Sequence, residues 1–193
     1  MTVDRDAARK AIADFLRALG RDPSRENELE KTPERVVAAY ADELLSGYDV
    51  DFDQLIADGS SEASPASGIV ALRGVRIATV CPHHLLPALG SATVAYAPGT
   101  LVLGLGTLAR LVDAFARRLT LQEQIGENVV RALMERAGAV GAYCEIELVH
   151  GCLSARGPCQ TQARALTVAR AGTLASPEAT APLARAVDDA ESP

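Results

Sequence analysis

Every histidine of this chain lies next to a cysteine, in two short clusters. The chain has three histidines and four cysteines; the first cluster is CPHH at residues 81–84, and the second is HGC at residues 150–152. Thiolates and imidazoles are ligands that zinc prefers, and a catalytic zinc site uses three protein ligands and leaves a fourth position for water. We therefore predict that Cys81, His84 and Cys152 bind one zinc ion, which activates water.

Two histidines remain beside this predicted metal centre. His83 and His150 could move protons there, because zinc lowers the pKa of a water molecule to about 7. Three alternatives exist: buried cysteines with ordinary loop histidines, a disulfide between Cys81 and Cys152, and a closed structural zinc site with four ligands. The gathering of all three histidines into cysteine-containing clusters favours catalysis. A purely structural zinc would leave one histidine too many.

The elements that must position these clusters follow from hydrophobic periodicity. The first cluster follows a predicted strand, and the second ends another. The order of elements is strand–strand–helix–helix–strand–strand, which predicts an α+β fold with an antiparallel four-stranded sheet. We expect strands at 69–79, 91–96, 143–149 and 161–169, a return strand beginning at 101–103, and helices at 107–117 and 121–137.

Two further helices are expected before the sheet. One covers residues 5–19, and the next begins with Thr32 as its cap and Pro33 in its first turn, then ends at Gly47. We divide the chain into an N-terminal helical arm, a linker rich in Ser, Ala and Gly, a catalytic domain, and a tail that is poorly ordered beyond a short helix. These parts are residues 1–56, 57–68, 69–172 and 173–193.

Charge and hydropathy limit the possible partners and location. The net charge is −6, which argues against nucleic-acid binding because phosphate neutralisation needs a basic surface. No run of eighteen apolar residues occurs, so no membrane span is expected, and the N-terminus lacks the apolar core of a signal peptide. We predict a cytoplasmic protein, in which cysteines are more often thiols, metal ligands or catalytic groups than disulfide partners.

Four segments together resemble the GTP cyclohydrolase I family. They are TPERVVAAYADELLSGYD, CPHHLLPALGSATVAYAP, VLGLGTLARLVDAFARRLTLQEQ and HGCLSARG. The resemblance implies the tunnelling fold and a homodecamer of two pentameric rings with active sites at subunit interfaces. It also implies Cys81, His84 and Cys152 as zinc ligands, and His83 and His150 as proton-transfer residues.

The resemblance further implies how a purine nucleotide is bound. Gln122 and Glu123 match a pair near the purine, where the glutamate receives hydrogen bonds from the guanine edge, and Arg110 and Arg156 match arginines that hold a triphosphate. The implied reaction is attack of zinc-activated water at guanine C8 and loss of C8 as formate, which gives 7,8-dihydroneopterin triphosphate for pterin and tetrahydrofolate biosynthesis. Considered alone, Glu123 could be only the capping-box partner of Thr120, Arg110 a surface residue, and Arg156 part of a turn.

The chain departs from the family pattern where a triphosphate would bind. Gly106 and Thr107 stand where the family usually has serine and lysine, and Pro158 and Cys159 stand where it usually has a small apolar and a basic residue. Pro82 replaces a common glutamate. A charge-assisted contact contributes about 1.5–3 kcal/mol, so the loss of two cations would weaken triphosphate binding by orders of magnitude.

Two alternatives to an ordinary GTP cyclohydrolase I therefore remain open. The first is a paralogue that acts on a guanine compound with fewer phosphates, or that stops before pterin formation in a specialised pathway. The second is a non-catalytic, zinc-containing scaffold with the same fold. Retention of His83 and His150 favours an enzyme over the scaffold.

Overall fold

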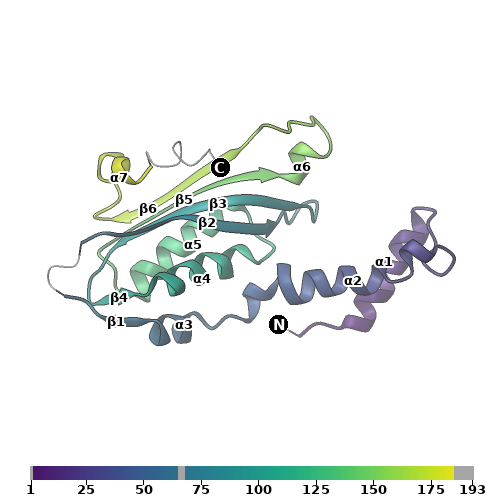
Figure 1. Cartoon of the computed structure of the whole chain (residues 1–193), viewed down its shortest axis with the longest axis horizontal. Coiled ribbons are helices and arrows are strands. Elements are labelled where there is room, and N and C mark those ends of the chain that lie inside the picture. The colour runs from purple at the N-terminus through teal and green to yellow at the C-terminus, as the bar shows by residue number, and fades with distance from the viewer. Residues whose placement is uncertain (1, 65–67, 185–193) are drawn as a thin grey trace.

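The computed structural model describes residues 2–64 and 68–184, and its centre is one antiparallel sheet. The strands are β2 (Val70–Val80), β3 (Pro87–Ala97), β5 (Gly141–His150) and β6 (Ala165–Gly172), in the spatial order β2-β3-β5-β6. Helices α4 (Leu105–Ala116) and α5 (Gln122–Glu135) follow β3 in the chain and precede β5, and both lie on one face of the sheet (Figure 1). The predicted α+β class, the four-stranded antiparallel sheet and the two intervening helices are confirmed.

The core lies between this sheet face and the two helices. Large apolar side chains from α4, α5, β3 and β5 are fully buried there, and they include Leu108, Leu111, Ile125, Leu133, Val94, Ile146 and Leu148. A smaller buried cluster on the other face joins the sheet to helix α7 (Pro177–Ala184) through Ala95, Tyr143, Leu174 and Leu183. The sheet is therefore a rigid support whose strand ends can hold side chains in fixed positions.

Strand register determines which loops meet at one end of the sheet. In the β2–β3 ladder Val80 lies opposite Pro87, and in the β3–β5 ladder Ala88 lies opposite His150. The turn of residues 81–86 and the end of β5 therefore lie at the same end of the sheet. A short helix, α6 (Gly151–Ser154), which the sequence did not predict, begins directly after β5.

The N-terminal arm contains more irregular helix than expected. It has α1 (Arg5–Ala18), η1 (Asn27–Leu29) and α2 (Thr32–Ala38), and α2 continues as a π-helical segment, η2 (Ala39–Leu44). The arm then leads through the 3-10 helix η3 (Ser46–Asp49) to an unpredicted helix, α3 (Phe52–Asp58). Helices α1 and α2 pack on each other and extend away from the sheet (Figure 1).

Two predictions for the second helix need correction. Pro33 lies in the first turn as predicted, but Thr32 is already the first helical residue and Lys31 precedes it without a side-chain cap, so Thr32 is not the cap. Gly47 lies beyond the helix, in η3, where its backbone passes so close to α4 that an added Cβ would lie 2.0 Å from the carbonyl oxygen of Ala114. Close approach of two backbones therefore requires glycine there.

The segment around the predicted linker also differs from expectation. Strand β4 (Leu101–Leu103) has the predicted residues, but it pairs with β1 (Ser60–Glu62) in a separate two-stranded sheet instead of returning to the main one. Residues 65–67 of the linker and 185–193 of the tail lie outside the described residues. Within the described part of the chain, no helix is both long and apolar enough to span a bilayer.

The capping arrangement of α5 is shifted by one residue from the predicted capping box. Helix α5 begins at Gln122, and the side-chain Oε1 of Gln124 accepts a hydrogen bond from the backbone N–H of Leu121 at 3.3 Å. The same oxygen lies 3.2 Å from the hydroxyl of Thr120. Glu123 is exposed and is not the capping partner, so its carboxylate is available for another role.

Candidate active site

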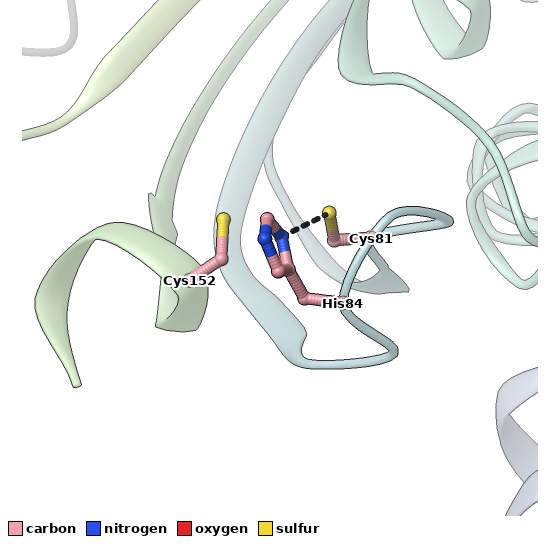
Figure 2. Close-up of side chains that lie close together, drawn as sticks. All are labelled: Cys81, His84 and Cys152. Carbon is pink, nitrogen blue, oxygen red and sulfur yellow. Dashed lines mark hydrogen bonds between the residues drawn. The ribbon is translucent and has the colours of Figure 1, made fainter. Parts of the chain in front are cut away.

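The two cysteine-containing clusters meet at the end of the sheet. Cys81 and His84 lie in the turn after β2, and Cys152 lies in α6 after β5; one candidate ligand atom from each of the three lies within 4.8 Å of the others (Figure 2). Cys81 is 8% exposed, Cys152 is partly buried and His84 is exposed. The structure therefore brings together the three side chains predicted to bind zinc.

Backbone hydrogen bonds close the turn that carries two of these side chains. The N–H of Cys81 donates to the carbonyl oxygen of Leu86 at 3.0 Å, and the N–H of Leu85 donates to the carbonyl oxygen of Cys81 at 2.9 Å. Leu85 has a φ of 53°, a left-handed conformation that is uncommon for a residue other than glycine. Outside the turn, the hydroxyl of Tyr40 donates to the carbonyl oxygen of Leu85 at 2.5 Å.

The chemistry of the three donors fits a metal ion such as zinc. Burial raises the pKa of the Cys152 thiol, and the neighbouring Cys81 sulfur raises it further, while Arg156 lowers it. Two adjacent thiols resist deprotonation because both would carry negative charge, and a cation bound by both removes that penalty. Two sulfurs and one imidazole nitrogen are donors typical of zinc sites. All four cysteines are free, so the disulfide alternative is not formed here.

His150 is held beside this cluster by a buried glutamine. Gln122 is 4% exposed, and its Nε2 group donates to the carbonyl oxygens of Ile146 at 2.9 Å and Ala165 at 2.8 Å. Its Oε1 therefore faces His150 Nε2, at 2.7 Å. Because an amide oxygen only accepts hydrogen bonds, Nε2 of His150 must carry the proton. In the neutral ring, Nδ1 is then the proton acceptor.

Arg156 contacts the candidate metal ligand His84. One of its guanidinium nitrogens lies 3.0 Å from His84 Nε2. A guanidinium only donates, and a neutral imidazole offers a single nitrogen lone pair. This contact and metal binding by His84 therefore exclude each other, so Arg156 must leave the ring when His84 binds a metal. His83 completes the group, with its Nδ1 3.9 Å from the Cys81 sulfur.

Two of the nine predicted site residues, Arg110 and Glu123, lie on helices α4 and α5 and not in the turn or the short helix that carry the candidate metal ligands. Arg110, on α4, lines a cavity of about 390 Å³ together with Asp49, Asp58 and Thr107, and the three candidate metal ligands do not line it. Glu123 is exposed in the first turn of α5, directly after Gln122. The roles assigned to these residues and to Gln122 in substrate binding stay predictions.

Two contacts that shape the site have no counterpart in the sequence patterns. The hydrogen bond from Tyr40 to Leu85 joins residues 45 positions apart, and no local pattern indicates it. The three bonds of the Gln122 side chain depend on strands β5 and β6, which follow it in the chain. Burial of a polar residue at the start of α5 is a consequence of tertiary packing that a single sequence does not reveal.

The GTP cyclohydrolase I family model matches residues 8–186 of the chain. This chain belongs to the GTP cyclohydrolase I family. It is 39% identical over 180 residues to GTP cyclohydrolase 1 of Leifsonia xyli subsp. xyli, covering 93% of each chain. It is 40% identical over 146 residues to GTP cyclohydrolase 1 of Leptospira biflexa, covering 76% of this chain and 78% of that protein. The resemblance noted from the sequence motifs is confirmed.

One solved structure is also similar in part. The apo form of the archaeosine synthase QueF-Like has 17% sequence identity and a TM-score of 0.45, and the match covers 56% of this chain and 98% of that one. The tunnelling fold expected for the GTP cyclohydrolase I family agrees with the four-stranded antiparallel sheet and the two helices between its strand pairs.

Proposed function

We propose that this chain is a zinc-dependent GTP cyclohydrolase I. It would open the imidazole ring of guanine at C8, release formate and form 7,8-dihydroneopterin triphosphate. The observation that carries this proposal is the convergence of Cys81, His84 and Cys152 within 4.8 Å, with His83 3.9 Å from the Cys81 sulfur and His150 two residues before Cys152. Membership of the GTP cyclohydrolase I family supports it.

The proposed roles follow from the donor atoms. Cys81, His84 and Cys152 would hold Zn²⁺, which when bound supplies a Lewis acid that lowers the pKa of water to about 7. His150 would accept and return a proton at Nδ1, because its Nε2–H is engaged by Gln122. His83, whose Nδ1 lies 3.9 Å from the Cys81 sulfur, would serve as a second proton carrier.

The substrate would be held by groups that surround this centre. Glu123 is exposed and would accept hydrogen bonds from the N–H groups of the guanine edge. Arg156, once displaced from His84, would be free to bind an anionic group of the substrate. The same step that prepares the metal site would therefore provide a cation for the phosphate end.

We further propose that the chain works as a homodecamer of two pentameric rings, with active sites at subunit interfaces. Arg110 lines a cavity that the candidate metal ligands of its own chain do not line, so a phosphate-binding Arg110 would come most simply from a neighbouring subunit. The arm also leaves Phe15 and Leu19 more than half exposed, at 60% and 62%. A cytoplasmic location and a place in pterin biosynthesis are parts of the same proposal.

A substrate with fewer phosphates is the second candidate, and the cavity at Arg110 favours it. Three carboxylates, those of Asp49, Asp51 and Asp58, line that cavity with a single arginine. Thr107 packs on the backbone of Gly59, where an added Cβ would lie 1.9 Å from the threonine Oγ1. A cavity lined by three carboxylates and one guanidinium is unfavourable for a polyphosphate, which carries several negative charges.

Formate release from four guanine compounds tests these proposals. Purified, zinc-loaded protein would be supplied with GTP, GMP, guanosine or guanine, and formate and pterin formation would be measured. Turnover of GTP to a pterin supports the first candidate. Turnover of GMP, guanosine or guanine, with no turnover of GTP, supports the second candidate. The absence of formate from all four compounds would leave only the non-catalytic scaffold and would reject the enzymatic proposal.

A further inference from the structure

The hydroxyl of Tyr40 links the N-terminal arm to the turn that carries two candidate metal ligands. It donates to the carbonyl oxygen of Leu85 at 2.5 Å. Tyr40 belongs to the π-helical segment η2, and η2 contacts strand β2, after which the turn begins. The arm therefore reaches the turn from outside the sheet that supports it.

Leu85 needs such support because its backbone is strained. Its φ of 53° lies in the left-handed region, which is costly for a leucine. The leucine side chain is 51% exposed, so burial of that side chain does little to hold the conformation. The bonds that remain are those at its backbone: its N–H donates to the carbonyl oxygen of Cys81 at 2.9 Å, and its own carbonyl accepts from Tyr40.

The helix carrying Tyr40 is itself irregular at this residue. The carbonyl oxygen of Tyr40 accepts a hydrogen bond from the N–H of Leu45 at 2.9 Å, five residues further on, which is the π-helical pattern. Single π turns within helices are uncommon and occur often at functional sites. An irregular helix and a strained turn thus meet at one hydrogen bond.

We propose that Tyr40 is a positioning residue for the metal centre. Its hydroxyl holds the turn of residues 81–86 in the conformation in which Cys81 and His84 face Cys152. A site that is formed only part of the time binds its ligand more weakly in proportion to the fraction formed. The inference rests on the proposed zinc site and adds to it a determinant located in the arm.

The test compares two single-atom deletions in the arm of the full-length protein. Tyr40→Phe removes the hydroxyl that donates to Leu85, and Tyr48→Phe removes one from a tyrosine whose described contact is between its ring and Arg118. Zinc dissociation constants would be measured by competition with a chelator, and the absorption spectrum of the Co²⁺-substituted protein would report the ligand geometry. Thermal unfolding of the metal-free proteins would show whether either substitution affects the whole fold.

We expect Tyr40→Phe to weaken zinc binding by about 3- to 10-fold, the value of one hydrogen bond, and to alter the Co²⁺ spectrum. Tyr48→Phe should match the unsubstituted protein, and the metal-free unfolding temperature of Tyr40→Phe should fall by no more than the few degrees that one hydrogen bond accounts for. Equal zinc affinity in all three proteins, or an equal loss in both variants, would overturn the inference. If the unsubstituted protein binds no zinc, the proposed function itself fails, which is a different outcome.

A second substitution tests the role of backbone strain. Asparagine adopts the left-handed conformation more readily than leucine. We therefore expect Leu85→Asn, introduced into the Tyr40→Phe protein, to recover part of the lost zinc affinity. A double variant that binds zinc no better than Tyr40→Phe alone would contradict the inference that the hydroxyl acts by holding a strained residue.

Discussion

Replacement of Gln122 by methionine preserves the length of a buried side chain and removes all of its hydrogen bonds. Gln122 donates to the carbonyl oxygens of Ile146 and Ala165, and accepts from Nε2 of His150. Each bond contributes about 0.5–1.5 kcal/mol net, so three bonds correspond to roughly 2–4 kcal/mol of unfolding free energy. For a chain of this length that loss lowers the melting temperature by roughly 4–16 °C.

The same substitution should affect catalysis through His150. Without an acceptor at Nε2, the His150 ring is free to exchange tautomers and to rotate, so Nδ1 is no longer held as the proton acceptor. General acid–base catalysis contributes about 10²–10⁴-fold to a rate, and we expect Gln122→Met to lose a large part of that factor. The loss should appear in kcat more than in KM, because the affected group transfers a proton.

Gln124→Met is the matched control for this experiment. Gln124 lies two residues further along the same helix, is exposed, and accepts a hydrogen bond from Leu121 at the helix start. Its replacement should cost at most about 1 kcal/mol and leave kcat unchanged. Melting curves of the zinc-loaded proteins and formate-release kinetics would be compared. A Gln122→Met protein that melts and turns over like Gln124→Met would refute the role assigned to the buried network.

Three further predictions concern Cys152, Cys144 and Arg156. Cys152→Ala should abolish zinc binding and formate release together, whereas Cys159→Ala, at an exposed cysteine outside the cluster, should leave zinc content at one ion per chain by metal analysis. Burial raises the pKa of the Cys144 thiol to about 12, so at pH 8 it stays protonated, and a thiol reagent that labels Cys159 should label Cys144 only after unfolding. Arg156→Ala removes a competitor for the His84 lone pair, which should raise zinc affinity by about 2- to 10-fold in chelator competition. The substitution also removes the smallest of the influences on the pKa of the Cys152 thiol, a lowering by Arg156, so a net weakening of zinc binding would contradict the exclusion argument.

The Cys–His–Cys cluster that could bind a metal was predictable because its residue types are rare and their local context is clear. Three histidines beside cysteines at two predicted strand ends define the candidate ligands without any knowledge of their distance. The sheet and its two helices were predictable for a related reason, since hydrophobic periodicity is a local property. The structure adds the register that places Ala88 opposite His150 and so brings both clusters to one end of the sheet.

Two of the features that differ from the sequence-based expectation depend on contacts between distant segments, and the third is a local shift. Gly47 was interpreted as a helix end, but its role comes from the approach of its backbone to Ala114. Strand β4 was expected to return to the main sheet, but β1 pairs with it, and the composition of β1 is that of a loop. Helix α5 begins one residue later than expected, so the side chain of Gln124, and not that of Glu123, accepts a hydrogen bond at the helix start.

The two parts of the proposed site are built by different elements of the fold. The candidate metal ligands follow strands β2 and β5, whose ends are held in register by their ladders with β3. The cavity at Arg110 is lined instead by residues of the arm, α3 and the first turns of α4, and Thr107 there packs on Gly59. If Arg110 binds phosphate as proposed, substitutions at positions 106 and 107 would change phosphate binding without disturbing the candidate metal ligands. Of the two departures from the family pattern on α4, Thr107 lines this cavity and Gly106 directly precedes it, so altered phosphate binding there would leave the candidate metal ligands in place.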